Sequence, residues 1–192
     1  MPSPPSFHLD TALAKGLREL FRLLEQRLDL KRPLAVYLAG GMATHLYTAQ
    51  RVTTDVDAEF AGRVLLPNDL VLEITLENGV AQLIYFDTNY NATFALMHED
   101  YQHDSLPIDL GLKQLHVRVL SPVDLAVSKI ARLADNDKED IQALVRLGLA
   151  TPHEIQQRAT QALDGFVGGR AMLELNLRDA LDLARAAQAQ RP

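Results

Sequence analysis

The stretch Leu34-Ala-Val-Tyr-Leu-Ala-Gly-Gly41, followed by Asp55-Val-Asp57, decides the fold of this chain. An apolar run that ends at Gly40 and Gly41 predicts a short buried strand over 34–39, which turns sharply into a helix over 41–48. Glycine has no Cβ, so backbone amides at such a turn can approach phosphate oxygens, and a helix N-terminus attracts negative charge. The turn is therefore a candidate phosphate-binding site.

The aspartates belong to a segment that we expect to form one strand over 53–60. Alternation along a strand places Asp55, Asp57 and Glu59 on one face, opposite Val56 and its neighbours. Carboxylates on one face repel each other unless cations lie between them. A divalent metal such as Mg²⁺ explains their placement, and together with the glycine turn it points to phosphoryl chemistry.

Three segments carry a family resemblance: Tyr37-Leu-Ala-Gly-Gly-Met-Ala43, Arg51-Val-Thr-Thr-Asp-Val-Asp57 and Ser121-Pro-Val-Asp-Leu-Ala-Val-Ser-Lys129. Their pattern resembles the nucleotidyltransferase superfamily, which has a polymerase-beta-like fold. More narrowly, it is similar to the abortive-infection (AbiEii-like) branch, which includes toxins of bacterial toxin–antitoxin pairs. The resemblance covers roughly 34–145 and implies an α/β fold, with a mixed-sheet core over 1–120 and a helical C-terminal subdomain over 121–192.

The resemblance also implies a site with two Mg²⁺ ions and an NTP as co-substrate. Asp55 and Asp57 match the metal-binding pair, and a third carboxylate on a later strand completes the set. Asp87, which closes the apolar run 82–87, is the first candidate, and Asp109 is the second. Glu59 lies too close to Asp57 to reach the opposite side of the metals and is interpreted as a flanking residue.

A lysine segment follows the core. Ser121 and Pro122 are a helix-start signal, and the apolar spacing predicts a helix over 122–134 with Lys129 and Arg132 on one face. In the resembling family a lysine here meets the nucleotide phosphates, and Lys129 matches it. Weaker matches are Arg132, Lys138 and Asp140. Weaker candidates for the nucleotide site are Thr44 and Thr54, as residues that orient phosphate or metal-bound water. Asn136 is expected to interrupt the helix, which resumes over 137–147.

Each motif has a plainer interpretation. The glycines can form only a tight turn, the aspartates can be solvated residues of an edge strand, and the cationic pair can be a solvated helix face. His45 is more typical of a satisfied polar residue than of a ligand. His98 and His103 lack the helical spacing of a zinc site.

Composition narrows the function classes. The chain has 192 residues, a net charge of −6 and no cysteine, and no apolar run approaches a membrane span. Residues 51–110 hold eleven acidic and two basic side chains, which argues against a broad nucleic-acid surface there. Residues 1–6 are expected to be a flexible lead without a secretion signal, and a cytoplasmic location is the expectation.

The remaining elements are expected as helices at 10–30, near 67–70, 152–164 and 168–189, and as strands at 71–76, 80–87 and 115–120. The predicted activity is metal-dependent transfer of a nucleoside monophosphate from an NTP to an acceptor hydroxyl on tRNA, other RNA or a protein, by the toxin of a toxin–antitoxin or abortive-infection system. The open alternatives are a protein-nucleotidylating antitoxin, an aminoglycoside-type transferase and an inactive binding relative. Expected partners are the NTP, the acceptor, a cognate antitoxin and a second copy of the chain in a homodimer, with no membrane.

Overall fold

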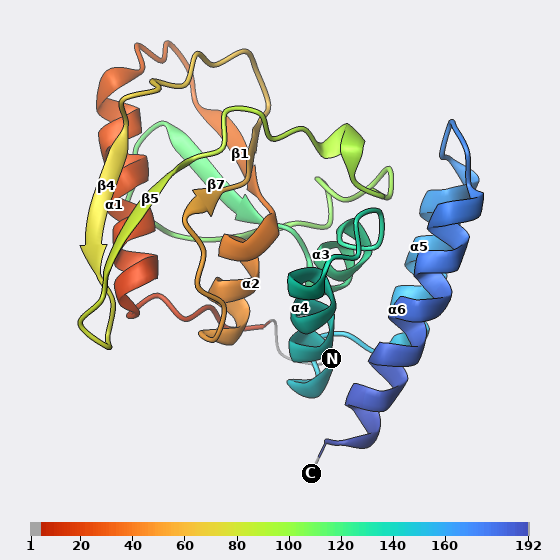
Figure 1. Cartoon of the computed structure of the whole chain (residues 1–192). Coiled ribbons are helices and arrows are strands. Elements are labelled where there is room, and N and C mark those ends of the chain that lie inside the picture. Colours follow the sequence, from red (N-terminus) through yellow and green to blue (C-terminus); the bar gives the residue numbers. More distant parts are fainter. Residues whose placement is uncertain (1–4, 192) are drawn as a thin grey trace. The chain divides into compact units, whose positions relative to one another are not determined.

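The computed structural model describes residues 5–191, so residues 1–4 of the predicted N-terminal lead lie outside it (Figure 1). The chain divides into two compact units. The first runs up to Tyr90 and includes Ser105–Val119, and the second comprises Asn91–Asp104 and the residues from Leu120 onward. Among residues 5–191, no helix has the length and apolar character that crossing a membrane requires.

The first unit contains two sheets. The four-stranded sheet has the order β3 (Ala58–Phe60), β1 (Leu34–Leu38), β7 (Leu115–Val119), β6 (Leu106–Pro107), in which only β1 and β7 are parallel. The three-stranded sheet has the order β2 (Asp55–Val56), β5 (Ala81–Phe86), β4 (Val71–Thr75), in which β2 and β5 are parallel. Parallel and antiparallel pairs occur in both, which confirms the predicted mixed α/β class.

Helix α1 (Ala12–Arg27) covers one face of the β4–β5 pair (Figure 1). The Thr11 hydroxyl caps this helix by accepting the Ala14 N–H. A Cβ on Gly16 would lie 2.7 Å from Ile74 Cγ2, so the glycine allows the helix to pack closely on the sheet. Phe21 of α1 meets Phe86 of β5 edge-on, with 5.0 Å between ring centroids.

The predicted strand over 53–60 is wrong as a single element. It consists of β2 and β3, which belong to different sheets, and Asp57 lies between them. Hydrogen bonds to two different strands explain why the segment is divided. The Asp87 N–H donates to Val56 O in the three-stranded sheet, and the Ala39 N–H donates to Asp57 O beside the four-stranded sheet. Alternation nevertheless holds across the break, since Val56 and Ala58 are both buried.

The helix predicted near 67–70 is also wrong, because these residues form a turn before β4. The Leu70 N–H donates to Pro67 O at 3.2 Å, and the Val71 N–H donates to Asp69 O at 3.0 Å. Pro, Asn and Asp in succession favour a turn over a helix.

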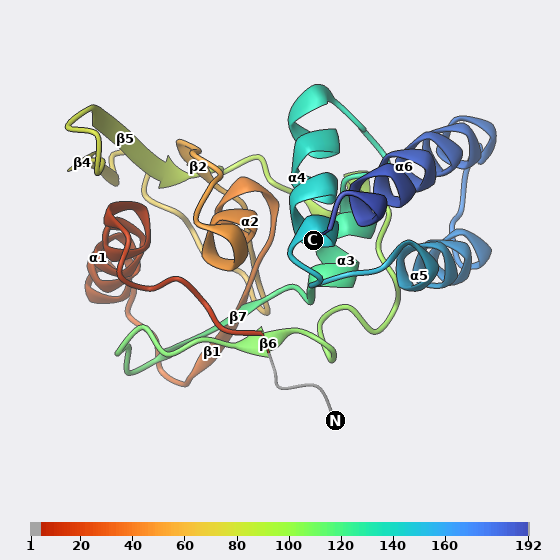
Figure 2. The same cartoon turned by 90° about the horizontal axis from the view of Figure 1, so that it is seen from below.

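The second unit is helical, as predicted for the C-terminal part. It contains the short 3₁₀ helix η1 (Ala92–Phe94) and the helices α3 (Pro122–Ser128), α4 (Asp135–Arg146), α5 (Pro152–Asp164) and α6 (Ala171–Ala189). Helix α6 packs against α4 and α5 through a buried apolar stripe, and Figure 2 shows α5 beside α6. The stripe comprises Leu173, Leu177, Ala180, Leu181, Ala184 and Ala187.

The region around Asn136 differs from the prediction. Helix α3 ends at Ser128 rather than at 134, and Leu133 adopts a left-handed φ of 46°. Asn136 does not break a helix but lies in the first turn of α4. The reason is the Asp137 carboxylate, which accepts the Ala134 N–H at 3.0 Å and stabilises the start of α4 at Asp135.

Candidate metal and nucleotide site

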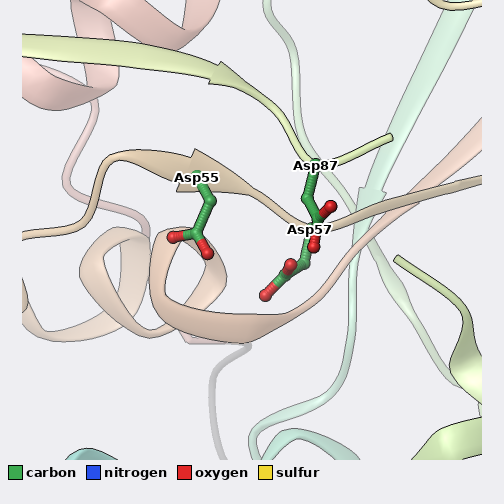
Figure 3. Close-up of side chains that lie close together, drawn as sticks. All are labelled: Asp55, Asp57 and Asp87. Carbon is green, nitrogen blue, oxygen red and sulfur yellow. The ribbon is translucent and has the colours of Figure 1, made fainter. Parts of the chain in front are cut away.

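Three carboxylates gather in the first unit. Asp55, Asp57 and Asp87 each offer an oxygen, and these oxygens all lie within 4.8 Å of one another (Figure 3). All three side chains are half-buried. Of the two candidates for the third carboxylate, the structure places Asp87 in this group. Asp109 is not part of it, and its carboxylate instead accepts the Gly111 N–H at 2.8 Å in an exposed turn.

The pairing of β2 with β5 brings the carboxylates together. Asp55 lies opposite Tyr85, and the Asp87 N–H donates to Val56 O one step further along. Val56 and Phe86 point into the core, so alternation directs Asp55, Asp57 and Asp87 to the opposite, outer face of the sheet.

Glu59 does not join the three aspartates. It lies in β3, opposite Tyr37, in the other sheet. This agrees with its interpretation as a flanking residue.

Gly40 lies directly against Asp57. Its φ is +61°, and a Cβ built on it would lie 1.7 Å from Asp57 Oδ2. The preceding Ala39 N–H donates to Asp57 O at 2.9 Å. Both the backbone conformation and the space therefore require glycine at this position, and the glycine turn meets the aspartate pair as the sequence pattern predicts.

Gly41 makes room for Thr53, a residue that sequence reasoning misses. A Cβ on Gly41 would lie 3.0 Å from both Thr53 Cβ and Thr53 Oγ1. The buried Thr53 hydroxyl donates to Asp55 Oδ1 at 2.5 Å and so orients this carboxylate. The sequence does contain a sign of this contact, because Thr53 and Asp55 are two residues apart and therefore lie on the same side of an extended segment. The predicted Thr54 is exposed instead.

His45 connects the elements around the site rather than serving as a ligand in this structure. Its Nε2 lies 2.7 Å from the Thr11 hydroxyl, and its Nδ1 lies 2.6 Å from Arg51 O. Burial lowers the pKa of His45 below its ordinary value, and a neutral ring satisfies both contacts by donating from Nδ1 and accepting at Nε2. His45 thereby holds the Arg51 segment, which leads into β2, against the N-terminus of α1.

Helix α2 (Gly40–Thr48) begins at the glycine pair, within one residue of the prediction. Its N-cap, Ala39, has no side-chain oxygen with which to cap the first-turn amides. The Thr44 hydroxyl donates to Gly40 O at 3.1 Å and is buried within the helix. A contact between Thr44 and a phosphate stays a prediction.

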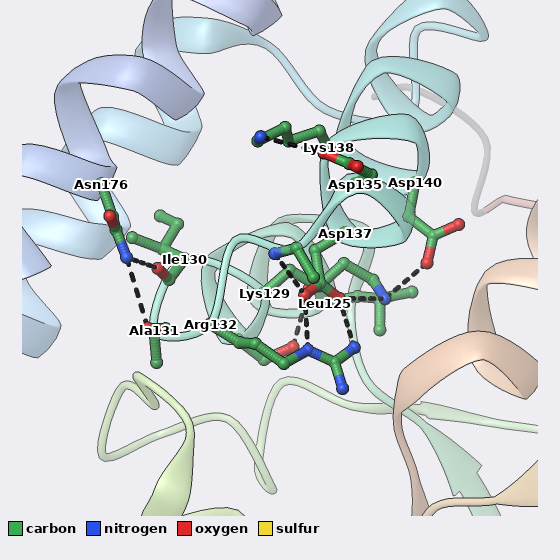
Figure 4. Close-up of polar contacts among 12 residues, drawn as sticks. Leu125, Lys129, Ile130, Ala131, Arg132, Asp135, Asp137, Lys138, Asp140 and Asn176 are labelled. Atoms are coloured by element: carbon green, nitrogen blue, oxygen red, sulfur yellow. Dashed lines mark hydrogen bonds and ion pairs between the residues drawn. The ribbon is translucent and has the colours of Figure 1, made fainter.

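Lys129 and Arg132 lie in the second unit, on a buried cluster of acids (Figure 4). Lys129 Nζ is 2.6 Å from Asp140 Oδ2 and 3.7 Å from Asp137 Oδ1. The Arg132 guanidinium donates twice to Asp137, at 2.8 and 2.9 Å. The two cations do not share a helix face, since α3 ends before both, but their side chains converge on Asp137.

Asp137 is the member of this cluster that sequence reasoning misses. Burial raises the pKa of its carboxyl, but the hydrogen bond from Arg132 and the charges of Lys129 and Arg132 outweigh burial, so the pKa lies below its ordinary value. The sequence does contain a sign of this cluster, because Asp137 precedes Asp140 by three residues and residues at this spacing are neighbours on a helix surface. The formal charges of the four side chains cancel.

The donor set of the aspartate group fits a hard divalent cation. Mg²⁺ takes oxygen ligands, and carboxylates whose oxygens approach within a few ångström of one another supply them. The absence of a Cβ at residue 40 leaves the space that the Asp57 carboxylate occupies, since a Cβ there would lie 1.7 Å from Oδ2. No other group of potential metal ligands occurs among residues 5–191.

A mixed-sheet α/β core with a glycine turn set against three carboxylates in or directly after strands β2 and β5, followed by a helical C-terminal part, is consistent with a nucleotidyltransferase fold. Residues 15–167 match the model of a family described as "Nucleotidyltransferase of unknown function (DUF6036)". This chain belongs to that family, and the match spans the glycine turn, all three aspartates and Lys129. The predicted superfamily is thereby confirmed. A search of curated proteins finds no match.

Proposed function

We propose that this protein transfers a nucleoside monophosphate from an NTP to an acceptor hydroxyl and releases pyrophosphate. The observation that carries the proposal is the approach of Gly40 to the group formed by Asp55, Asp57 and Asp87. A carboxylate group for a metal and a helix N-terminus for phosphates then lie at one place, which is what nucleotidyl transfer needs.

The aspartates have distinct proposed roles. Asp55 and Asp57 would hold two Mg²⁺ ions, and Asp87 would help to hold one of them. When bound, the ions lower the pKa of the incoming hydroxyl and neutralise charge on the departing pyrophosphate. Thr53 acts as a positioning residue, because its hydrogen bond fixes the Asp55 carboxylate.

The start of α2 is the proposed triphosphate site. Gly40, Gly41 and the next residue form the first turn of α2, whose N–H groups have no acceptor within the helix and can stabilise phosphate oxygens. Thr44 and Thr54 are the proposed auxiliary contacts from the sequence pattern.

Lys129 and Arg132 remain proposed phosphate contacts on the strength of the family resemblance. In this structure their charges are already balanced by Asp137 and Asp140, so contact with a phosphate requires Lys129 to exchange a carboxylate for it. A fold-stabilising role for Lys129 follows directly from its burial between two acids.

The reaction balances without any further co-reactant. The acceptor oxygen forms a bond to the α-phosphorus as the bond from this phosphorus to the bridging oxygen of pyrophosphate breaks. The hydroxyl proton passes to water, and the product is a phosphodiester.

Label transfer tests the proposal. The purified chain is incubated with each common α-labelled NTP and Mg²⁺, with tRNA or protein as acceptor. We expect label that EDTA abolishes and that Asp57→Asn lowers by about a hundredfold or more. The matched control Asp109→Asn removes an exposed carboxylate outside the group and should retain activity. Failure to label any acceptor from any NTP would contradict the proposal.

We further propose that the protein is the toxin of a toxin–antitoxin or abortive-infection system, which the likeness of its glycine, aspartate and lysine segments to the AbiEii-like branch supports. Induced expression of the wild type should then arrest bacterial growth, and expression of Asp57→Ala should not. Equal growth of the two strains would contradict this assignment and would leave the transferase proposal standing.

A further inference from the structure

The outer face of the β4–β5 pair is exposed and partly apolar. Helix α1 covers the inner face, where Ile84 is fully buried. On the outer face, β4 presents Val71, Glu73 and Thr75, and β5 presents Ala81, Leu83 and Tyr85, all of which are exposed. Val71, Leu83 and Tyr85 retain 46, 49 and 40% of their accessible surface. Large side chains left open next to each other are typical of an interaction surface.

Tyr85 joins this apolar patch, Val71, Leu83 and Tyr85, to the metal site. It lies opposite Val71 on one side and opposite Asp55 on the other, in the registers of β4 and β2 with β5. Asp87 follows two residues later and so points to the same face. Neighbouring strands are about 4.8 Å apart. A chain lying on Val71, Leu83 and Tyr85 would therefore place its side chains beside the three carboxylates.

The charge of this face selects the class of occupant. All charged residues at the outward-facing positions of β2, β4 and β5 are acidic, namely Asp55 and Glu73. Asp57 and Asp87, which directly follow β2 and β5, add two more carboxylates. Proteins that bind single-stranded nucleic acid combine aromatic platforms with a positively charged groove along the phosphates. Asp55, Asp57 and Asp87 are the proposed metal ligands, so Glu73 is the acidic group left to face an acceptor. The outward-facing positions of β2, β4 and β5 carry no Lys or Arg, so this face offers no cation to phosphates, whereas Glu73 attracts basic side chains.

We propose that the acceptor is a polypeptide, and that a segment with apolar and basic side chains docks on Val71, Leu83 and Tyr85 and presents a Ser, Thr or Tyr hydroxyl to the metal site. This inference rests on the proposed function. The hydroxyl oxygen of the segment bonds to the α-phosphorus, pyrophosphate departs and the proton passes to water. The product is a nucleotidylated side chain.

Peptide labelling tests the acceptor class. The full chain is incubated with α-labelled NTP and Mg²⁺ together with total tRNA and two sets of short synthetic peptides. Each peptide carries one Ser, Thr or Tyr among apolar residues, with lysines in one set and glutamates in the other. We expect label on the lysine set, weaker label on the glutamate set and none on tRNA.

Two variants connect the labelling to the patch. Leu83→Gln removes apolar surface from its centre without adding charge and should lower peptide labelling by about fivefold or more. Val80→Gln is the matched control: Val80 is also exposed, but it precedes β5 at the hairpin turn, about 17 Å along the strand from Tyr85. It should label peptides as the wild type does. Binding of a non-hydrolysable NTP analogue with Mg²⁺ should be unchanged in both variants.

The failures are distinguishable. Label on tRNA instead of peptides, or equal labelling by Leu83→Gln and the wild type, overturns the polypeptide assignment. Mg²⁺-dependent binding of the NTP analogue without label on either acceptor overturns it as well. Absence of this nucleotide binding in the wild type overturns the proposed function itself.

Discussion

Replacing Gly40 by alanine is the sharpest test of the site, because it adds a single methyl group at the contact with Asp57. That Cβ would lie 1.7 Å from Asp57 Oδ2, whereas ordinary van der Waals contact begins at 3.4 Å. The carboxylate must therefore move by about 1.7 Å, the difference between these distances. A displacement of about 1 Å at a catalytic group can cost about a hundredfold in rate, and we expect at least this loss.

Alanine at position 40 also strains the backbone, and a matched variant separates the two effects. Gly111 has a similar φ of +69°, but a Cβ on it would meet nothing within 4 Å. The left-handed conformation costs a non-glycine residue about 1–2 kcal/mol. For a chain of this size that cost lowers the melting temperature by roughly 2–8 °C, in Gly40→Ala and Gly111→Ala alike.

The assay combines thermal unfolding with Mn²⁺ titration followed by electron paramagnetic resonance. We expect both variants to lose stability, Gly40→Ala at least as much as Gly111→Ala because of the contact with Asp57, but only Gly40→Ala to lose Mn²⁺ affinity, by about tenfold or more. Equal Mn²⁺ affinity in Gly40→Ala and Gly111→Ala would refute the idea that Gly40 shapes the metal site.

Three further predictions concern single side chains. Asp87→Asn should weaken Mn²⁺ binding by about tenfold or more, and Asp109→Asn should leave it unchanged, as measured by the same titration. Because burial lowers the pKa of His45, its contribution to stability is full above about pH 6.5 and is lost as the pH falls toward the lowered value. Urea unfolding should show a smaller decline between neutral and mildly acidic pH in His45→Gln than in the wild type. Lys129→Met should destabilise the fold by about 3–5 kcal/mol, because it removes the buried cation that pairs with the buried Asp140 carboxylate. Lys138→Met, at an exposed pair, should change the unfolding free energy by less than about 1 kcal/mol.

Each of these has a contrary result. Loss of Mn²⁺ binding in Asp109→Asn but not in Asp87→Asn would mean that the third ligand is assigned to the wrong strand. An unchanged pH profile in His45→Gln would mean that the buried ring does not couple folding to protonation. Similar stability of Lys129→Met and the wild type would show that the ion cluster does not support the second unit.

Local sequence patterns predict much of the site. The apolar run before Gly40 predicts strand β1, and the two glycines predict the turn at which α2 begins. Both features act within a few residues. The spacing from Gly40 to Asp57 also predicts their contact, and the apolar run that Asp87 closes favours Asp87 over Asp109 as the third member of the group.

The parts of the fold that local patterns do not predict depend on hydrogen bonds and ion pairs between different elements. Residues 53–60 read as one strand because alternation continues through Asp57, but hydrogen bonds from Asp87 and Ala39 assign its halves to different sheets. The start of α4 depends on the Asp137 carboxylate, which accepts the Ala134 N–H, and the buried Lys129 has its ion-pair partner Asp140 on the following helix. Hydrophobic periodicity in the sequence contains no information about such pairings.

Anomalous diffraction from crystals soaked in Mn²⁺ and a non-hydrolysable NTP analogue would locate a divalent cation held by Asp55, Asp57 and Asp87. We expect an anomalous peak within about 2.5 Å of oxygens from all three carboxylates, with the phosphates of the analogue at the N-terminus of α2. Mn²⁺ bound elsewhere, or nucleotide bound away from Gly40 and Gly41, would contradict it.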